Sequence, residues 1–211
     1  MIAAISIRPG HHLEFDRFYE DYYIPDLLKA APVIESVTRF GAVGAAHGQS
    51  FLHSEYVTVY KLKDEPNVAE VVELAVTSPA HKKAFEQFRA WKSEYFSHFD
   101  RAYYADEWVP GSDTTRSSFI PFEGERITLR TYNKRGEALE NAEAMPESSL
   151  FHRQTPSGGE GEEAYIIASP MAAGSEIELP GQLDFSPDGA APGARGSINL
   201  ARLRVLSGTK S

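Results

Sequence analysis

The sequence predicts an α+β fold whose amino-terminal half is an antiparallel sheet with two helices on one face. Three observations indicate this fold. Polar and apolar residues alternate in segments 2–8 and 55–62, and aromatic residues recur at helical spacing in segment 13–29. Ser78-Pro79 has the residues of a helix start, and an apolar stripe follows it to about residue 99.

The first strand and the first helix follow each other directly. The strand covers residues 2–8 and ends at Pro9-Gly10, and the helix covers residues 13–29. Pro25 lies late in this helix, where it removes a backbone donor and clashes with the preceding turn. We therefore expect the helix to kink or restart at Pro25.

Two strands, a second helical region and a closing strand come next. The strands cover residues 36–40 and 55–62, and Val57 and Val59 share one face of the second. The helical region begins near residue 67, and a closing strand covers residues 101–108. The resulting order, βαββαβ, is that of a ferredoxin-like sheet, whose second face needs a cover.

The chain divides in composition near residue 110. We expect a first domain at 1–109, a linker at 110–122, and a second domain at 123–211 that is richer in glycine and proline. A short ungapped match places Val37 over Phe151 and Arg39 over Arg153, which favours a degenerate second ferredoxin-like copy. The alternative is an unrelated β-rich extension.

Composition excludes several classes of function. The absence of cysteine excludes disulfides, thiolate metal sites and cysteine nucleophiles. Thirty acidic and 21 basic residues give a net charge of −9, which repels phosphate backbones and argues against nucleic-acid binding. No apolar run approaches the ~20 residues of a membrane span, and the first residues alternate like a strand rather than a signal peptide. We expect a cytoplasmic protein.

The stretch 17–28, RFYEDYYIPDLL, is followed by a strand with Val37, Thr38, Arg39 and Phe40. It resembles the signature of the EthD-like dimeric α+β barrel proteins, which carry aromatic and acidic residues, Pro-Asp and then a strand arginine. The resemblance implies paired sheets with a pocket between each sheet and its helices. Members of that family include polyketide cyclases and other cofactor-free enzymes, so the resemblance also implies chemistry of this kind. Tyr23 stands where the pattern usually has histidine, so imidazole chemistry does not carry over to that position.

Four residues are candidates for catalysis: Tyr23, Arg39, His53 and His81. The tyrosine hydroxyl can bind or protonate a phenolic or carbonyl oxygen, and a strand arginine can hold a carboxylate or an oxyanion. His53 precedes the clearest strand and His81 precedes the aromatic stripe of the second helix, so either can serve as a base. The structural alternatives are a core tyrosine, an arginine paired with a carboxylate, and surface or capped histidines.

Aromatic residues of the two helices are the candidates for substrate binding. They are Tyr19, Tyr22, Phe15, Phe85, Phe88 and Trp91. Such stripes can line a cavity that excludes water, or they can simply pack the core.

We therefore expect an enzyme that needs neither a metal nor an organic cofactor and acts on a small hydrophobic, aromatic or polyketide-like compound. Acid–base chemistry of the lyase, cyclase or isomerase type fits these residues. The alternatives are a non-catalytic binding or accessory protein and a cofactor-free monooxygenase. We expect a homodimer, because the second half looks too reduced to cover a whole sheet.

Overall fold

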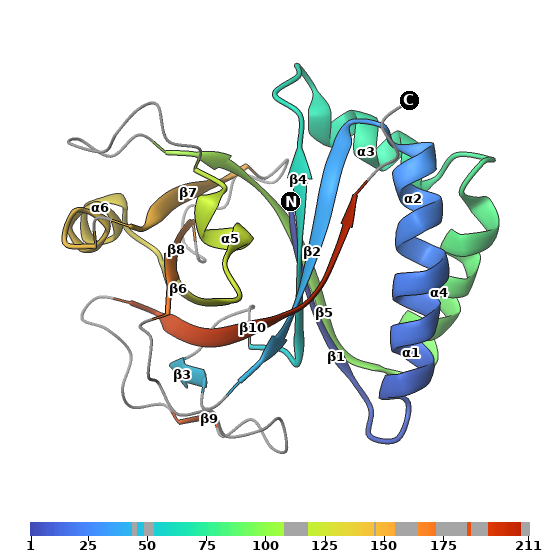
Figure 1. The fold of residues 1–211 in the computed structure, drawn as a ribbon, viewed down its shortest axis with the longest axis horizontal. Coiled ribbons are helices and arrows are strands. Elements are labelled where there is room, and N and C mark those ends of the chain that lie inside the picture. Colours follow the sequence, from blue (N-terminus) through green and yellow to red (C-terminus); the bar gives the residue numbers. More distant parts are fainter. Residues whose placement is uncertain are drawn as a thin grey trace.

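The computed structural model of the chain describes residues 1–43, 46–48, 53–107, 118–145, 147–154, 164–171, 185–186 and 194–207. Its long strands form one closed antiparallel barrel (Figure 1). The order around the ring is β2-β4-β1-β5-β7-β8-β6-β10, and β10 pairs again with β2. Two short strands, β3 and β9, extend the sheet beyond β10.

The predicted fold class is wrong. The two halves of the chain do not form a ferredoxin-like α+β barrel domain with a separate appendage. Instead β5 pairs with β7 and β10 pairs with β2, so strands of both halves close one barrel. The physical reason is that an open sheet leaves unpaired N–H and C=O groups along both edges, and closure removes both edges at once.

The first half supplies the ring strands β1 (Ile2–Ile7), β2 (Ile34–Ala42), β4 (Tyr56–Leu62) and β5 (Phe96–Asp106), and the short β3 (Ala46–Gly48). Its helical segments are α1 (His12–Phe18), the π-helix η1 (Tyr19–Tyr23), α2 (Ile24–Ala30), α3 (Val68–Val76) and α4 (Lys82–Glu94). Figure 1 shows these helices together on one side of the barrel, over the outer face of the sheet.

The second half supplies β6 (Arg126–Tyr132), β7 (Ser149–Gln154), β8 (Tyr165–Pro170), the short β9 (Phe185–Ser186) and β10 (Gly196–Ser207), with helices α5 (Ile120–Glu123) and α6 (Arg135–Glu143). The four ring strands of each half lie in the same spatial order: second, third, first, fourth. Most of the predicted linker 110–122 lies outside the described residues. So does most of segment 170–196, which is rich in the turn formers glycine and proline.

The side chains of each strand alternate between two cores. Val57 and Val59 face the barrel interior, while Tyr56 and Tyr60 face the helices, as the alternation in segment 55–62 predicts. The interior is packed rather than hollow, and Phe122 of α5 is buried in it. The remaining buried members of this core are Ile2, Phe40, Ala42, Ile127, Leu129, Phe151, Ile166, Ala168, Ile198 and Leu200.

The first helical region restarts where Pro25 predicts a break. The α-helix α1 ends at Phe18, five residues form a π-helix, and α2 begins at Ile24. The predicted end of the second helix is wrong, because α4 ends at Glu94 and β5 already begins at Phe96. Phe96 and Phe99 continue the helical spacing of the stripe, but pairing with β1 from Ile7 onwards holds this segment as a strand.

Candidate functional site

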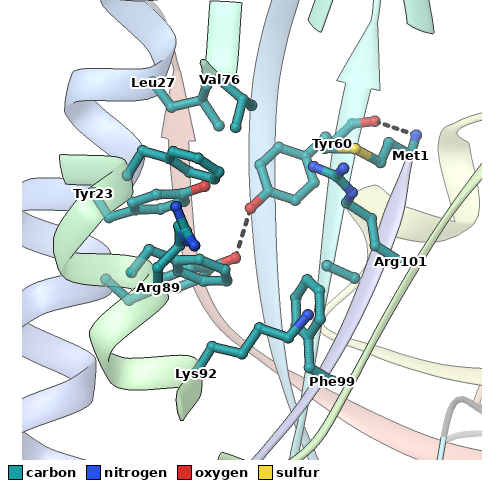
Figure 2. A pocket seen from close by; sticks show the side chains of 13 residues that line it. Met1, Tyr23, Leu27, Tyr60, Val76, Arg89, Lys92, Phe99 and Arg101 are labelled. Carbon is teal, nitrogen blue, oxygen red and sulfur yellow. Dashed lines mark hydrogen bonds between the residues drawn. The ribbon is translucent and has the colours of Figure 1, made fainter. Parts of the chain in front are cut away.

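A cavity of about 290 Å³ lies between the helices and the outer face of β1, β4 and β5 (Figure 2). This is where the family resemblance implies a pocket. The lining residues are Met1, Ala3, Tyr19, Tyr23, Leu27, Tyr60, Val76, Phe85, Phe88, Arg89, Lys92, Phe99 and Arg101. Six of these thirteen residues are aromatic and four are aliphatic, and the polar side-chain groups are of two kinds: tyrosine hydroxyls and cations.

The π-helix positions two of the tyrosines. The N–H of Ile24 donates to the carbonyl of Tyr19, five residues back, which widens the turn just ahead of Pro25. The rings of Tyr19 and Tyr23 stack within this turn, with centroids 5.3 Å apart and planes 9° apart. Single π-turns of this kind occur frequently at functional sites.

A hydrogen bond between two tyrosines joins the helix to the sheet. The hydroxyl oxygens of Tyr19 and Tyr60 lie 2.6 Å apart and are buried, and either hydroxyl can donate to the other. Burial raises the pKa of Tyr19, Tyr60 and Tyr23 above the ordinary tyrosine value. At neutral pH these groups are neutral phenols, so they suit donation to a ligand oxygen and not proton abstraction.

Every charged side chain that lines the cavity among the described residues is a cation. Arg89 and Lys92 come from α4 and Arg101 comes from β5. Arg101 is compensated, because its Nη2 donates to both carboxylate oxygens of Glu73 on α3 at 2.7 and 2.8 Å. Lys92 lies with its Nζ 4.3 Å from the centre of the Phe99 ring.

The structure brings together some of the predicted site residues. Tyr19, Tyr23, Phe85 and Phe88 line the cavity. The other three predicted contact residues pack beside it: Phe15 is fully buried, and Tyr22 and Trp91 are partly buried against the same core.

Arg39 lies outside the cavity lining. Its side chain is 0% exposed, and its guanidinium donates to Glu20 at 2.5 Å and to Asp16 at 2.7 Å. It also lies 4.2 Å above the Tyr56 ring. The structure thus places Arg39 in the carboxylate pairing that the sequence leaves open as the alternative to ligand binding.

The two predicted histidine bases also lie outside the lining. His81 is 0% exposed at the start of α4, and its Nδ1 is 2.7 Å from a carboxylate oxygen of Asp26. Its ring packs against Tyr23 with centroids 5.0 Å apart. His53 precedes β4 and is not among the lining residues. Among the described residues, no histidine lines the cavity.

Sequence reasoning missed Tyr60, Arg89, Lys92, Phe99 and Arg101. A signal for two of them is present, because positions 85, 88, 89 and 92 share one helix face at spacings of three and four. The alternation of segment 55–62 also places Tyr60 on the face opposite Val57 and Val59.

The fold and the cavity define a closed antiparallel β-barrel protein with a helix-covered aromatic cavity on the outer face of its sheet. No protein-family profile, curated protein or solved structure matches the chain. In the part of the chain that the structure describes, no helix has the length and apolar character to traverse a bilayer. That part also contains no cluster of three or more side chains suited to hold a metal ion.

Proposed function

We propose that this protein binds a small, largely aromatic or polyketide-like molecule in the cavity between its helices and its sheet. One observation carries the proposal: the hydrogen-bonded Tyr19 and Tyr60 hydroxyls face a cavity that four further aromatic rings and several aliphatic side chains also line. Small-molecule sites in proteins commonly combine an apolar lining with a few polar groups that fix orientation.

The size and chemistry of the cavity restrict the kinds of ligand that it can bind. Its volume of about 290 Å³ is near the lower end of ligand pockets, which suits a molecule of one to three fused or linked rings. One tyrosine donates within the pair, so the proton of the accepting hydroxyl is left for another acceptor. A ligand with a carbonyl or phenolic oxygen supplies that acceptor.

Binding can be tested with Prodan, a fluorescent naphthyl ketone whose emission reports both apolar surroundings and hydrogen bonding to its carbonyl. We expect saturable binding that weakens about fivefold in Tyr60→Phe, since one hydrogen bond contributes about 1 kcal/mol. Tyr22→Phe is the matched control, because it also removes one tyrosine hydroxyl, and Tyr22 belongs to the π-helix of Tyr19 but does not line the cavity.

A second substitution tests where the probe binds. Ala3 lies on β1 with its side chain on the cavity, so Ala3→Phe places a ring in the space that the ligand needs. Circular dichroism and thermal melting establish that this variant folds. Prodan binding that persists unchanged in folded Ala3→Phe contradicts the proposal.

Catalysis of proton transfer, as in a cofactor-free lyase, cyclase or isomerase, is the second candidate. The short bond between Tyr19 and Tyr60 favours it, because a bonded phenol pair can stabilise negative charge that develops on a substrate oxygen. Binding is placed first because no histidine or carboxylate lines the cavity among the described residues. Deuterium exchange at the methyl group of acetonaphthone, followed by NMR, tests this candidate, with loss of exchange expected in Tyr60→Phe.

A further inference from the structure

We infer that the ligand of this cavity is an aromatic acid, and that Arg89 and Lys92 hold its carboxylate at the cavity mouth. This inference rests on the proposed function and adds the charge of the ligand and the residues that recognise it. It follows from the distribution of charge around the cavity.

The cavity is positive on a negative protein. The chain carries a net charge of −9, yet the three charged side chains that line the cavity in the described structure are all cations. A cluster of one sign against an opposite overall charge focuses the local field and attracts a ligand of the opposite sign. Here that ligand is an anion.

Two of the three cations are uncompensated. Arg101 is paired with Glu73, and Tyr103 donates to the same carboxylate at 2.6 Å. Arg89 and Lys92 have no ion-pair partner among the described residues, and both are exposed. Their charges are therefore available to a ligand, and their exposure places them where the cavity meets solvent.

The geometry of α4 brings these two cations to one place. Residues three positions apart lie on the same face of a helix, and Phe85 and Phe88 continue that face into the cavity. The Lys92 ammonium lies against the Phe99 ring, which holds it at the cavity wall (Figure 2).

This arrangement places the apolar and hydrogen-bonding contacts inside the cavity and the charged contacts at its mouth. Phe85, Phe88 and Phe99 offer surface to an aromatic ring, and the Tyr19–Tyr60 pair offers a hydroxyl proton to an oxygen. The carboxylate stays at the mouth beside Arg89 and Lys92, where water continues to solvate it. This avoids the large cost of burying an unpaired charge.

The test compares two fluorescent probes with the same ring skeleton. Anilinonaphthalene sulfonate carries an anionic group, and N-phenylnaphthylamine lacks it; both brighten in apolar surroundings. We expect the wild-type protein to bind the anionic probe more tightly, and added salt to weaken that binding alone.

Substitutions of the two cations test whether they cause the preference for the anionic probe. Arg89→Met and Lys92→Met each should weaken binding of the anionic probe about two- to fivefold, the range for an exposed charge pair, and leave the neutral probe unchanged. Lys83→Met is the matched control, since Lys83 is an exposed cation of the same helix that does not line the cavity. It should affect neither probe.

The outcomes separate the two proposals. If Ala3→Phe abolishes binding of the neutral probe while Arg89→Met and Lys92→Met leave the anionic probe unaffected, the cavity binds ligands but the inference of an acid is overturned. If folded Ala3→Phe binds both probes as the wild type does, neither probe occupies the cavity and the proposed function itself fails.

Discussion

Arg39 joins the first helices to the barrel through charge. Its guanidinium contacts Asp16 on α1 and Glu20 on η1, while Glu20 also accepts from Arg204 on β10. Arg39 is wholly buried, so its desolvation must be offset by both carboxylates and by the Tyr56 ring beneath it. The residue therefore serves stability in this structure.

Arg39→Met should lower the free energy of unfolding by about 3 kcal/mol, because it removes the arginine that pairs with Asp16 and one of the two arginines at Glu20. Arg39→Lys should restore only part of this loss, since one ammonium cannot match two carboxylates and stack on a ring as a planar guanidinium does. Urea denaturation measures both values. The folded fraction of each variant should bind Prodan like the wild type, and a selective loss of affinity would instead assign Arg39 to the ligand.

The buried tyrosines should make the protein sensitive to alkali. Burial raises the pKa of Tyr19, Tyr23 and Tyr60, so the folded state keeps protons that the unfolded state loses above a pH of about 10. Their contribution to stability is complete below that pH and declines as pH rises. Above that pH the free energy of unfolding should therefore fall with rising pH. Tyr60→Phe should reduce the slope of this fall by about 1.4 kcal/mol per pH unit. Denaturation at several alkaline pH values measures the slope, and an unchanged slope contradicts the assignment.

The sequence predicts cavity residues where the signal is local. Tyr19, Tyr23, Phe85 and Phe88 follow from helical spacing alone, and all four line the cavity. Arg101 could not be assigned this way, because its place beside α3 depends on the pairing of β5 with β1. Arg39 shows the converse, since only the folded arrangement reveals that Asp16 and Glu20, and not a ligand, occupy its donors.

The carboxylate of Glu73 links helix α3 to strand β5. Glu73 accepts two bonds from Arg101 and one from Tyr103. These contacts fix one wall of the cavity and also neutralise its most buried cation. Removing the negative charge should therefore loosen the wall and expose positive charge at the same time.

Glu73→Gln should lower the unfolding free energy by about 1 kcal/mol, a value limited by the partial exposure of the pair. It should also increase affinity for anilinonaphthalene sulfonate about threefold, because Arg101 then attracts the anion. Fluorescence titration measures this gain. Glu70→Gln on the same helix is the control, since it makes the same charge change without a bond to Arg101, and an equal gain there would show a non-local effect of net charge.

Among the elements, the helix break at Pro25 could be predicted, while the form of that break could not. A proline interrupts the i→i−4 hydrogen bonds of an α-helix, but the chain can accommodate it with either a kink or a π-turn. The choice of the π-turn accompanies the stacking of Tyr19 on Tyr23 and the bond to Tyr60, which are contacts between elements. The end of α4 was misplaced for the same reason, because pairing with β1 decides where β5 begins.

At the scale of the molecule, periodicity identifies strands but not their neighbours. The pairings of β5 with β7 and of β10 with β2 join residues that lie far apart in the chain. Local sequence patterns therefore do not predict the closed barrel. The expected homodimer remains a prediction. Its stated reason no longer applies, however, because the second half contributes four strands to the ring and is not too reduced to complete it.

Closure within one chain can be tested with cysteines, since the chain has none of its own. Ser36 on β2 lies directly opposite Ser207 on β10. Facing residues of antiparallel strands are about 4.5 to 5.5 Å apart at Cα, within the range of a disulfide. The double variant Ser36→Cys/Ser207→Cys should therefore oxidise to a monomer with an internal bond, seen by thiol titration and non-reducing gel electrophoresis. Its loop of about 170 residues should add up to about 5 kcal/mol of stability.

The control for this variant pairs Ser207→Cys with Lys61→Cys on β4. Lys61 faces Ser36 from the other side, so it lies two strands away from Ser207, at about 10 Å, and should keep free thiols. If the barrel instead closes between two chains, the Ser36/Ser207 variant will run as a covalent dimer whose yield rises with protein concentration. That outcome would replace the single-chain ring by an exchange of strands between two copies, in which β10 of each chain completes the barrel of the other.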